Sequence, residues 1–201
     1  MLDGAMRPVI DPWVNRWGRG LALRGWSADA MTLLGLALGL AAAAMIAVGL
    51  PGWLAAVPLM AGRLADGLDG AIARAGKGSD FGGYLDITCD FLFYGAVPFA
   101  FALRAPEDAV AAAFLLLSFY VNGTTFLGYA VLAEKRRMVN DSRGLKSLYF
   151  TAGLMEGTET ILFFGTICLW PDGFQPLAWV FGALCFVTAG SRVLLARQVF
   201  G

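Results

Sequence analysis

Long apolar stretches separated by short polar breaks run along almost the whole of this chain of 201 residues. A helix needs about 20 predominantly apolar residues to cross the hydrocarbon core of a bilayer, which is roughly 30 Å thick. Stretches of about that length follow one another at 31–50, 53–75, 81–103, 108–133, 147–169 and 175–198. The pattern therefore predicts six transmembrane helices.

The breaks between these stretches hold residues that end helices or begin them. They lie at 51–52, 76–80, 106–108 and 171–173 and combine proline, glycine and acidic residues. Proline and glycine are the strongest local signals for turns, and acidic residues are common where helices begin. Because six spans leave no room for a second domain, we expect one membrane domain, residues 1–201, with the six-helix bundle in residues 27–201.

The N-terminal segment, residues 1–26, differs because tryptophan and arginine alternate with apolar residues. Trp13, Trp17 and Trp26 stand close to Arg16 and Arg19. This mixture suits an amphipathic helix lying in the membrane interface, and the alternative is a poorly ordered N-terminal arm. The expected fold class is all-α: a polytopic membrane protein with six transmembrane helices and an N-terminal interfacial amphipathic helix.

Composition supports a membrane protein and narrows its chemistry. Hydrophobic residues make up 58% and charged residues 15%, against about 45–50% and about 25% in soluble domains. The 15 basic residues balance 15 acidic ones, which argues against a nucleic-acid partner. The chain has no histidine, which excludes catalytic triads and zinc sites that need one.

Basic residues gather on one side of the predicted membrane. Arg74, Lys77, the N-terminal segment and the loop 134–146 supply most of them, whereas the turns at 51–52 and 170–174 have none. The excess of Lys and Arg in cytoplasmic loops predicts that both termini and the basic loops face the cytoplasm.

Four aspartates lie inside the second and third predicted spans, where an ionisable residue is costly and therefore suggests a function. Asp66 and Asp69 are three residues apart and Asp86 and Asp90 are four apart, so each pair shares one helix face. Asp66 and Asp90 also lie 12 residues before and after position 78. In a helical hairpin this spacing places them at one depth, so we expect the four carboxylates to meet near the cytoplasmic side.

Ionised carboxylates crowded into one desolvated volume repel one another, and bound divalent cations would compensate that repulsion. Oxygen ligands without cysteine or histidine favour Mg²⁺ or Mn²⁺. Two such ions bridged by carboxylates commonly serve phosphoryl transfer. The alternative is that the aspartates form structural ion pairs with Arg63, Arg74 and Lys77.

The stretch 66–90 reads DGLDGAIARAGKGSDFGGYLDITCD and resembles the signature of the CDP-alcohol phosphotransferases. That signature is D-x-x-D-G-x-x-A-R, followed after a short gap by G-x-x-x-D-x-x-x-D. Its fixed positions are all filled here, by Asp66, Asp69, Gly70, Ala73, Arg74, Gly82, Asp86 and Asp90. The resemblance implies a homodimeric enzyme of the inner membrane. It would transfer a phosphatidyl group from a CDP-linked lipid such as CDP-diacylglycerol to a small alcohol, with release of CMP, in phospholipid biosynthesis.

The resemblance also implies roles for single residues. Asp66, Asp69 and Asp86 would be ligands of two Mg²⁺ or Mn²⁺ ions, and Asp90 would be both a ligand and the base that deprotonates the attacking hydroxyl. The implied CDP-binding residues are Asp29, Thr32, Gly70, Arg74 and Ser79. A common form of the family has asparagine where Asp29 stands.

Residues that select the acceptor are expected in the second half of the chain. The loop 134–146 is basic and includes Arg143 and Lys146. It is either a cytoplasmic loop near anionic lipid or a funnel for an anionic acceptor.

Glu156 and Glu159 begin the fifth predicted span, three residues apart. Family members that use a phosphorylated acceptor resemble this region but carry arginine beside the glutamate, where Gly157 and Thr160 stand here. The difference favours an uncharged or cationic alcohol as the acceptor.

Two other classes of protein remain open. A divalent-cation transporter could also use intramembrane aspartates, although the fixed charge of Arg74 would repel a permeating cation and suits a phosphate better. A non-catalytic membrane scaffold could have kept the signature by descent, although the complete set of carboxylates argues against it.

Overall fold

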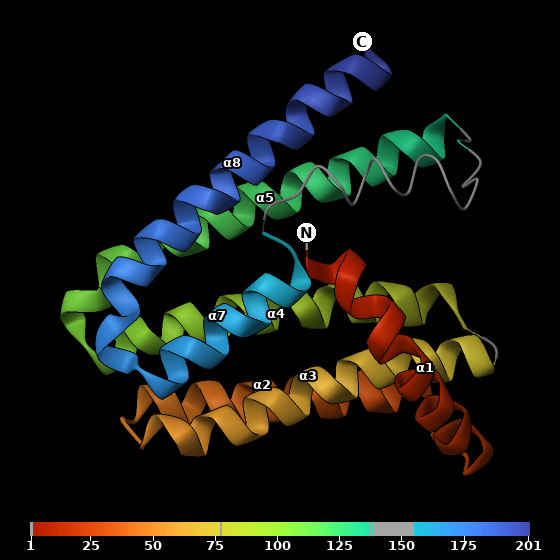
Figure 1. Ribbon diagram of the computed structural model, residues 1–201, viewed down its shortest axis with the longest axis horizontal. Coiled ribbons are helices and arrows are strands. Elements are labelled where there is room, and N and C mark those ends of the chain that lie inside the picture. The colour runs from red at the N-terminus through yellow and green to blue at the C-terminus, as the bar shows by residue number, and fades with distance from the viewer. Residues whose placement is uncertain (1, 77, 137, 139–154) are drawn as a thin grey trace.

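The computed structural model describes residues 2–76, 78–136, 138 and 155–201. Every regular element in these ranges is a helix, which confirms the all-α class. Two are short 3₁₀ helices, η1 (Pro106–Asp108) and η2 (Pro171–Gly173). The α-helices in Figure 1 are α1 (Leu2–Leu23), α2 (Ala28–Ala47), α3 (Gly52–Ala75), α4 (Asp80–Arg104), α5 (Ala109–Lys135), α7 (Gly157–Leu169) and α8 (Phe174–Phe200).

Several of these helices are long and apolar enough to cross a membrane, so the chain is a multi-pass membrane protein. Among the described residues, the candidates are four: Ala28–Ala47, Asp80–Arg104, Pro106–Lys135 and Pro171–Phe200. α3 has 24 residues, but its charged residues make it less apolar than these segments. α7 has 13 residues and is therefore only about 20 Å long. Residues 147–154 of the fifth predicted span lie outside the described residues.

The helices end where the sequence predicts breaks. Gly49 in the turn between α2 and α3 has φ +74°, a conformation that glycine adopts without strain. The side chains of Ser27 and Ser79 cap α2 and α4 by accepting hydrogen bonds from backbone N–H groups one turn later, at 3.2 and 2.9 Å. Prolines 106 and 171 begin η1 and η2.

The most extensive helix contacts are those of α2 with α3 and with α4, and that of α5 with α8 (Figure 1). Gly35 of α2 and Gly62 of α3 face each other, because a Cβ placed on Gly62 would lie 2.8 Å from the carbonyl oxygen of Gly35. Small residues at a helix crossing let two backbones approach closely. This close crossing holds α3 beside the start of α2.

The main core is built from aromatic side chains of several helices. Phe93, Phe101, Phe164 and Phe174 are completely buried, and the rings of Phe101 and Phe174 stack with their centroids 4.2 Å apart. This packing joins α4, α7 and α8.

A smaller cluster attaches the N-terminal helix α1 to the end of α3. Val14 packs with Ala71 and Ile72. A Cβ placed on Gly18 would lie 2.4 Å from the Cβ of Ala71, so α1 contacts the backbone of α3 closely at this point. Trp13 and Trp17 remain exposed.

Candidate active site

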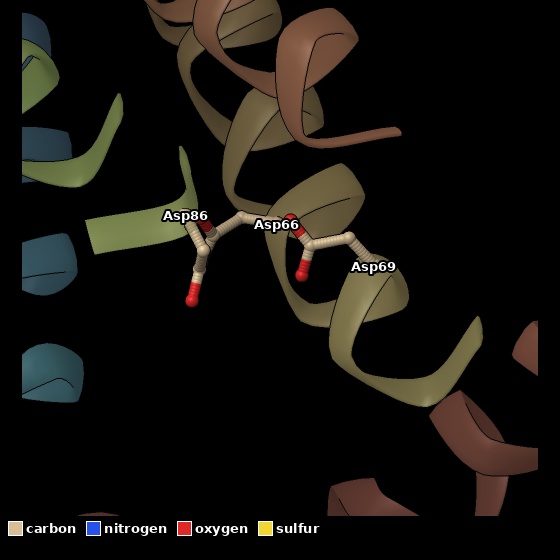
Figure 2. A group of neighbouring side chains, drawn as sticks. All are labelled: Asp66, Asp69 and Asp86. Carbon is tan, nitrogen blue, oxygen red and sulfur yellow. The ribbon is translucent and has the colours of Figure 1, made fainter. Parts of the chain in front are cut away.

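Three of the predicted aspartates converge between α3 and α4. Carboxylate oxygens of Asp66, Asp69 and Asp86 all lie within 4.8 Å of one another. Figure 2 shows Asp66 and Asp69 on successive turns of α3 with their side chains directed toward that of Asp86. Asp69 is only 5% exposed. The spacing of one turn within α3 therefore presents both of its carboxylates to α4.

Thr32 of α2 supports this cluster from a third helix. Its side chain is buried, and its hydroxyl donates a hydrogen bond of 2.5 Å to Oδ2 of Asp69. The close crossing of α2 and α3 brings the two residues together although they are 37 positions apart. Thr32 thus holds the side chain of Asp69 through one carboxylate oxygen, Oδ2.

The fourth aspartate, Asp90, is held by a buried arginine. Nη1 of Arg63 donates a hydrogen bond of 2.8 Å to Oδ1 of Asp90 and lies 3.4 Å from Oδ1 of Asp66. The guanidinium also stacks on Phe93, 3.9 Å from the ring centroid. The ion pairs considered as an alternative thus exist for Arg63, whereas Lys77 lies outside the described residues.

Arg74, the last signature residue of α3, contacts α1 instead of the aspartates. Its Nε and Nη2 donate hydrogen bonds of 3.3 and 2.9 Å to Oδ1 of Asn15. One turn earlier, a Cβ placed on Gly70 would meet only Nη1 of Arg74 within 4 Å. The exposed guanidinium therefore stands beside a helix surface that a ligand can approach closely.

Two other predicted CDP-binding residues meet where α2 and α4 begin. A Cβ placed on Gly82 would lie 2.9 Å from Oδ1 of Asp29 and 3.1 Å from Oγ of Ser79. The two residues are 50 positions apart in the sequence, yet both border the same glycine. Only the packing of α2 against α4 could bring them together.

A cavity of about 640 Å³, lined in part by Asp90, lies next to the carboxylate cluster. α4, α5, α7 and α8 supply its described walls, which are mainly apolar and aromatic. The polar side chains among the described lining residues are those of Asp90, Tyr94, Tyr120, Asn122, Glu156, Thr160 and Arg192. This cavity is large enough for a small alcohol with room to spare.

The two predicted acceptor glutamates form a capping box at the start of α7. The side chain of Glu156 accepts from the backbone of Glu159, and the backbone N–H of Glu156 donates to Oε2 of Glu159 at 3.3 Å. Such a pair satisfies backbone donors that a helix start leaves open. Glu156 also lines the cavity. The other two predicted acceptor residues, Arg143 and Lys146, lie outside the described residues.

Arg192 of α8 is a cavity residue that the sequence prediction missed. It is 9% exposed, and its Nη1 donates a hydrogen bond of 2.9 Å to Oδ1 of Asn122 on α5. The signal was present, because an arginine inside an apolar span is as costly as the aspartates that were singled out. What the sequence does not give is the direction in which α8 presents this side chain.

Residues 26–189 match the family model of the CDP-alcohol phosphatidyltransferases. The chain belongs to this family. It is therefore a phosphatidyltransferase. Family membership thus favours an enzyme over the cation transporter and the scaffold that the sequence alone left open.

Two curated relatives of this phosphatidyltransferase extend the match. The inner membrane protein YnjF of Escherichia coli is 47% identical over 195 residues, which cover 96% of this chain and 94% of YnjF. The archaetidylinositol phosphate synthase of Pyrococcus horikoshii is 37% identical over 99 residues, 49% of this chain and 52% of that enzyme.

The fold of the phosphatidyltransferase is also similar to solved structures of Mycobacterium tuberculosis phosphatidylinositol phosphate synthase. The structure with CDP-DAG bound has a TM-score of 0.69 at 25% identity, over 90% of this chain and 91% of that one. The complex with manganese and citrate has a TM-score of 0.68 at 25% identity, over 90% and 87% of the two chains.

Proposed function

We propose that this enzyme transfers the phosphatidyl group of CDP-diacylglycerol, or of a closely similar CDP-linked lipid, to a small alcohol and releases CMP, as a step of phospholipid biosynthesis. The observation that carries the proposal is the convergence of Asp66, Asp69 and Asp86 on the family signature. The similar synthase that was solved with CDP-DAG bound supports a CDP-linked lipid as the donor.

The carboxylate cluster fits a hard divalent cation, because its ligand atoms are all oxygens. Asp66, Asp69, Asp86 and Asp90 would hold two Mg²⁺ or Mn²⁺ ions, and a complex of the similar synthase contains manganese. Bound there, the ions would neutralise charge on the diphosphate and make CMP a better leaving group.

Asp29, Thr32, Gly70, Arg74 and Ser79 would bind the CDP group. Gly70 gives the ligand access to the backbone of α3, and the planar guanidinium of Arg74 can donate two parallel hydrogen bonds to phosphate oxygens. Asn15 holds that guanidinium from α1 before the donor binds. Asp29 and Ser79, which both border Gly82, would present acceptor oxygens to a ribose or base.

Asp90 would act as the base because it lies between the carboxylate cluster and the cavity. The acceptor oxygen forms a bond to the phosphorus that carries diacylglycerol, and the bond from this phosphorus to the CMP oxygen breaks. Asp90 takes the hydroxyl proton. A carboxylate is a weak base for an alcohol, so its position relative to the acceptor matters greatly.

The acceptor would be an unphosphorylated alcohol. Glu156 contributes a carboxylate to the cavity wall, and Gly157 and Thr160 stand where the family resemblance leads one to expect arginine in users of phosphorylated acceptors. A phosphorylated alcohol is the second candidate, because Arg192 contributes a cation to the same wall. The names of the solved synthase and of the archaeal relative also favour it.

The placement of the enzyme in the membrane follows from its charges and its relatives. Residues 1–201 would form one domain with six membrane-spanning helices, α3 and the segment ending in α7 among them, and α1 would lie in the interface. The excess of basic residues in the predicted loops supports an orientation in which both termini and the active site would face the cytoplasm. The name of the E. coli relative supports the inner membrane, and we expect a homodimer.

The test is release of CMP from CDP-diacylglycerol by the purified full-length protein in liposomes, with a panel of alcohols. We expect release that depends on one alcohol and on Mg²⁺ or Mn²⁺. Alcohol-independent release, or none with any member of a broad panel, would contradict the proposal.

A further inference from the structure

Arg63 is the buried group whose role the chemistry above leaves unexplained. It lies one turn before Asp66 on α3, is 7% exposed and is not one of the eight signature residues. A buried guanidinium is costly unless it is paired, so its neighbours should indicate its role.

Arg63 is attached to α4 at two points one turn apart. Its Nη1 donates a hydrogen bond to Oδ1 of Asp90, and its guanidinium carbon Cζ lies over the ring of Phe93. Within the described residues, Arg63 is the one side chain that donates a hydrogen bond to Asp90. Its Nε has no hydrogen-bond partner there, and the 2.8 Å contact of Nη1 with Asp90 is shorter than its 3.4 Å contact with Asp66.

Resting on the proposed function, we propose that Arg63 is a positioning residue for Asp90. By binding Oδ1, it turns the carboxylate so that Oδ2 is the oxygen available to the acceptor hydroxyl in the cavity. The stacking on Phe93 fixes the guanidinium, which a lysine in its place could not reproduce because it has no planar group. Arg63 would thus act on the reaction through Asp90 without touching the substrate.

The position of Arg63 has a second consequence, because its charge also lies 3.4 Å from Oδ1 of Asp66. A fixed positive charge beside the carboxylate cluster reduces its attraction for any divalent cation. Removal of the charge should therefore strengthen metal binding while it weakens catalysis. A residue needed only for folding would weaken both together.

The experiment compares wild type with Arg63→Met, Arg63→Lys, Asp90→Asn and the double variant Arg63→Met/Asp90→Asn, all in liposomes. Arg63→Met should lower kcat roughly 10- to 100-fold, as a misplaced catalytic group does, with the KM for CDP-diacylglycerol changed less than about threefold. Added to Asp90→Asn, it should lower kcat by less than about threefold more, because two residues that act as a unit are not additive. Arg104→Met, at the far end of α4, is the matched control and should change neither quantity.

Mn²⁺ titration gives a readout that needs no catalysis. The dissociation constant for Mn²⁺ should fall at least about threefold in Arg63→Met and stay near the wild-type value in Arg63→Lys. If Arg63→Met weakens Mn²⁺ binding, or if its loss of kcat multiplies with that of Asp90→Asn, Arg63 does not position Asp90. Absence of CMP release by wild type would instead defeat the proposed function, and the Mn²⁺ comparison would still decide whether Arg63 acts on the cluster.

Discussion

The carboxylate cluster between α3 and α4 and the cavity among α4, α5, α7 and α8 lie on either side of Asp90 but are assembled differently. The cluster comes from one helical hairpin, within residues 66–86: Asp66 and Asp69 are one helical turn apart on α3, and Asp86 faces them from α4. The cavity takes its described walls from residues 87–192 on four helices. Local spacing alone is enough to build the first, whereas the second exists only after the bundle has formed.

The two regions also differ in the groups they offer. The cluster presents oxygens that a hard cation would bind. Thr32 holds the carboxylate of Asp69, and Arg63 holds that of Asp90 beside the cluster. The cavity is mainly apolar, and apart from Asp90 its described walls carry one carboxylate, Glu156, opposite in charge to Arg192. We infer that chemistry on the donor is specified in the hairpin and that the choice of acceptor is specified by the packing of the later helices.

The largest loss of activity is expected from Asp69→Asn, in the carboxylate cluster of the hairpin. The amide keeps the size of the side chain but removes the charge that would hold a cation, so we expect CMP release to fall below detection. Mn²⁺ binding should be lost as well, and EDTA should inactivate wild type. Asp172→Asn, in η2 beyond the opposite end of the bundle, is the control that should keep full activity. Full turnover of wild type in a chelator would contradict the metal site.

The next largest effect should come from Asp90→Asn, at the boundary between the two regions. Loss of a general base lowers kcat by about 10²- to 10⁴-fold. Because CDP binding is assigned to other residues, the KM for CDP-diacylglycerol should change far less. The measurement is steady-state CMP release at varied donor and saturating alcohol. A change confined to KM would make Asp90 a binding residue only.

The same contrast explains what the sequence could predict. Asp66 and Asp69, or Asp86 and Asp90, share a helix face wherever those helices lie, and a short loop forces the two helices to be antiparallel neighbours. The convergence of Asp66, Asp69 and Asp86 could therefore be predicted from spacing. The breaks at Pro106 and Pro171 could be predicted too, because they depend on the local conformation of proline.

Contacts between distant segments could not be predicted in this way. No local rule pairs Asn15 with Arg74, or Arg192 with Asn122, which are 59 and 70 positions apart. The charge of Glu156 and Glu159 suggests acceptor residues, and their spacing also fits the capping box that they form. In α3 the same charges that indicate the active site make the helix less apolar than the four candidate membrane spans among the described residues.

A smaller effect should follow from Arg74→Lys, which tests the end of the hairpin that faces α1. Lysine keeps the charge but cannot donate two parallel hydrogen bonds to a phosphate. We expect the KM for CDP-diacylglycerol to rise roughly tenfold, the loss of about one good hydrogen bond to a charged group. Mn²⁺ binding should remain within about twofold of wild type. Asn15→Ala, which removes the hydrogen-bond acceptor of Arg74 but keeps the guanidinium, should raise the KM for CDP-diacylglycerol less. Wild-type kinetics in Arg74→Lys would contradict a contact between Arg74 and the diphosphate.

The smallest expected effect is on acceptor preference, and it shows whether Glu156 or Arg192 selects the acceptor in the cavity. Matched acceptors, such as inositol against inositol phosphate or glycerol against glycerol phosphate, are compared by CMP release at equal concentration. If Glu156 dominates, the unphosphorylated alcohol should be preferred roughly tenfold, because a phosphate near a carboxylate in a half-buried site is repelled. Glu156→Gln should reduce that preference, and the amide oxygen of glutamine can still cap α7. If wild type prefers the phosphate ester and Arg192→Gln loses that preference, Arg192 selects the acceptor. Arg192 of α8 would then supply the positive charge that arginines near the start of α7 supply in users of phosphorylated acceptors.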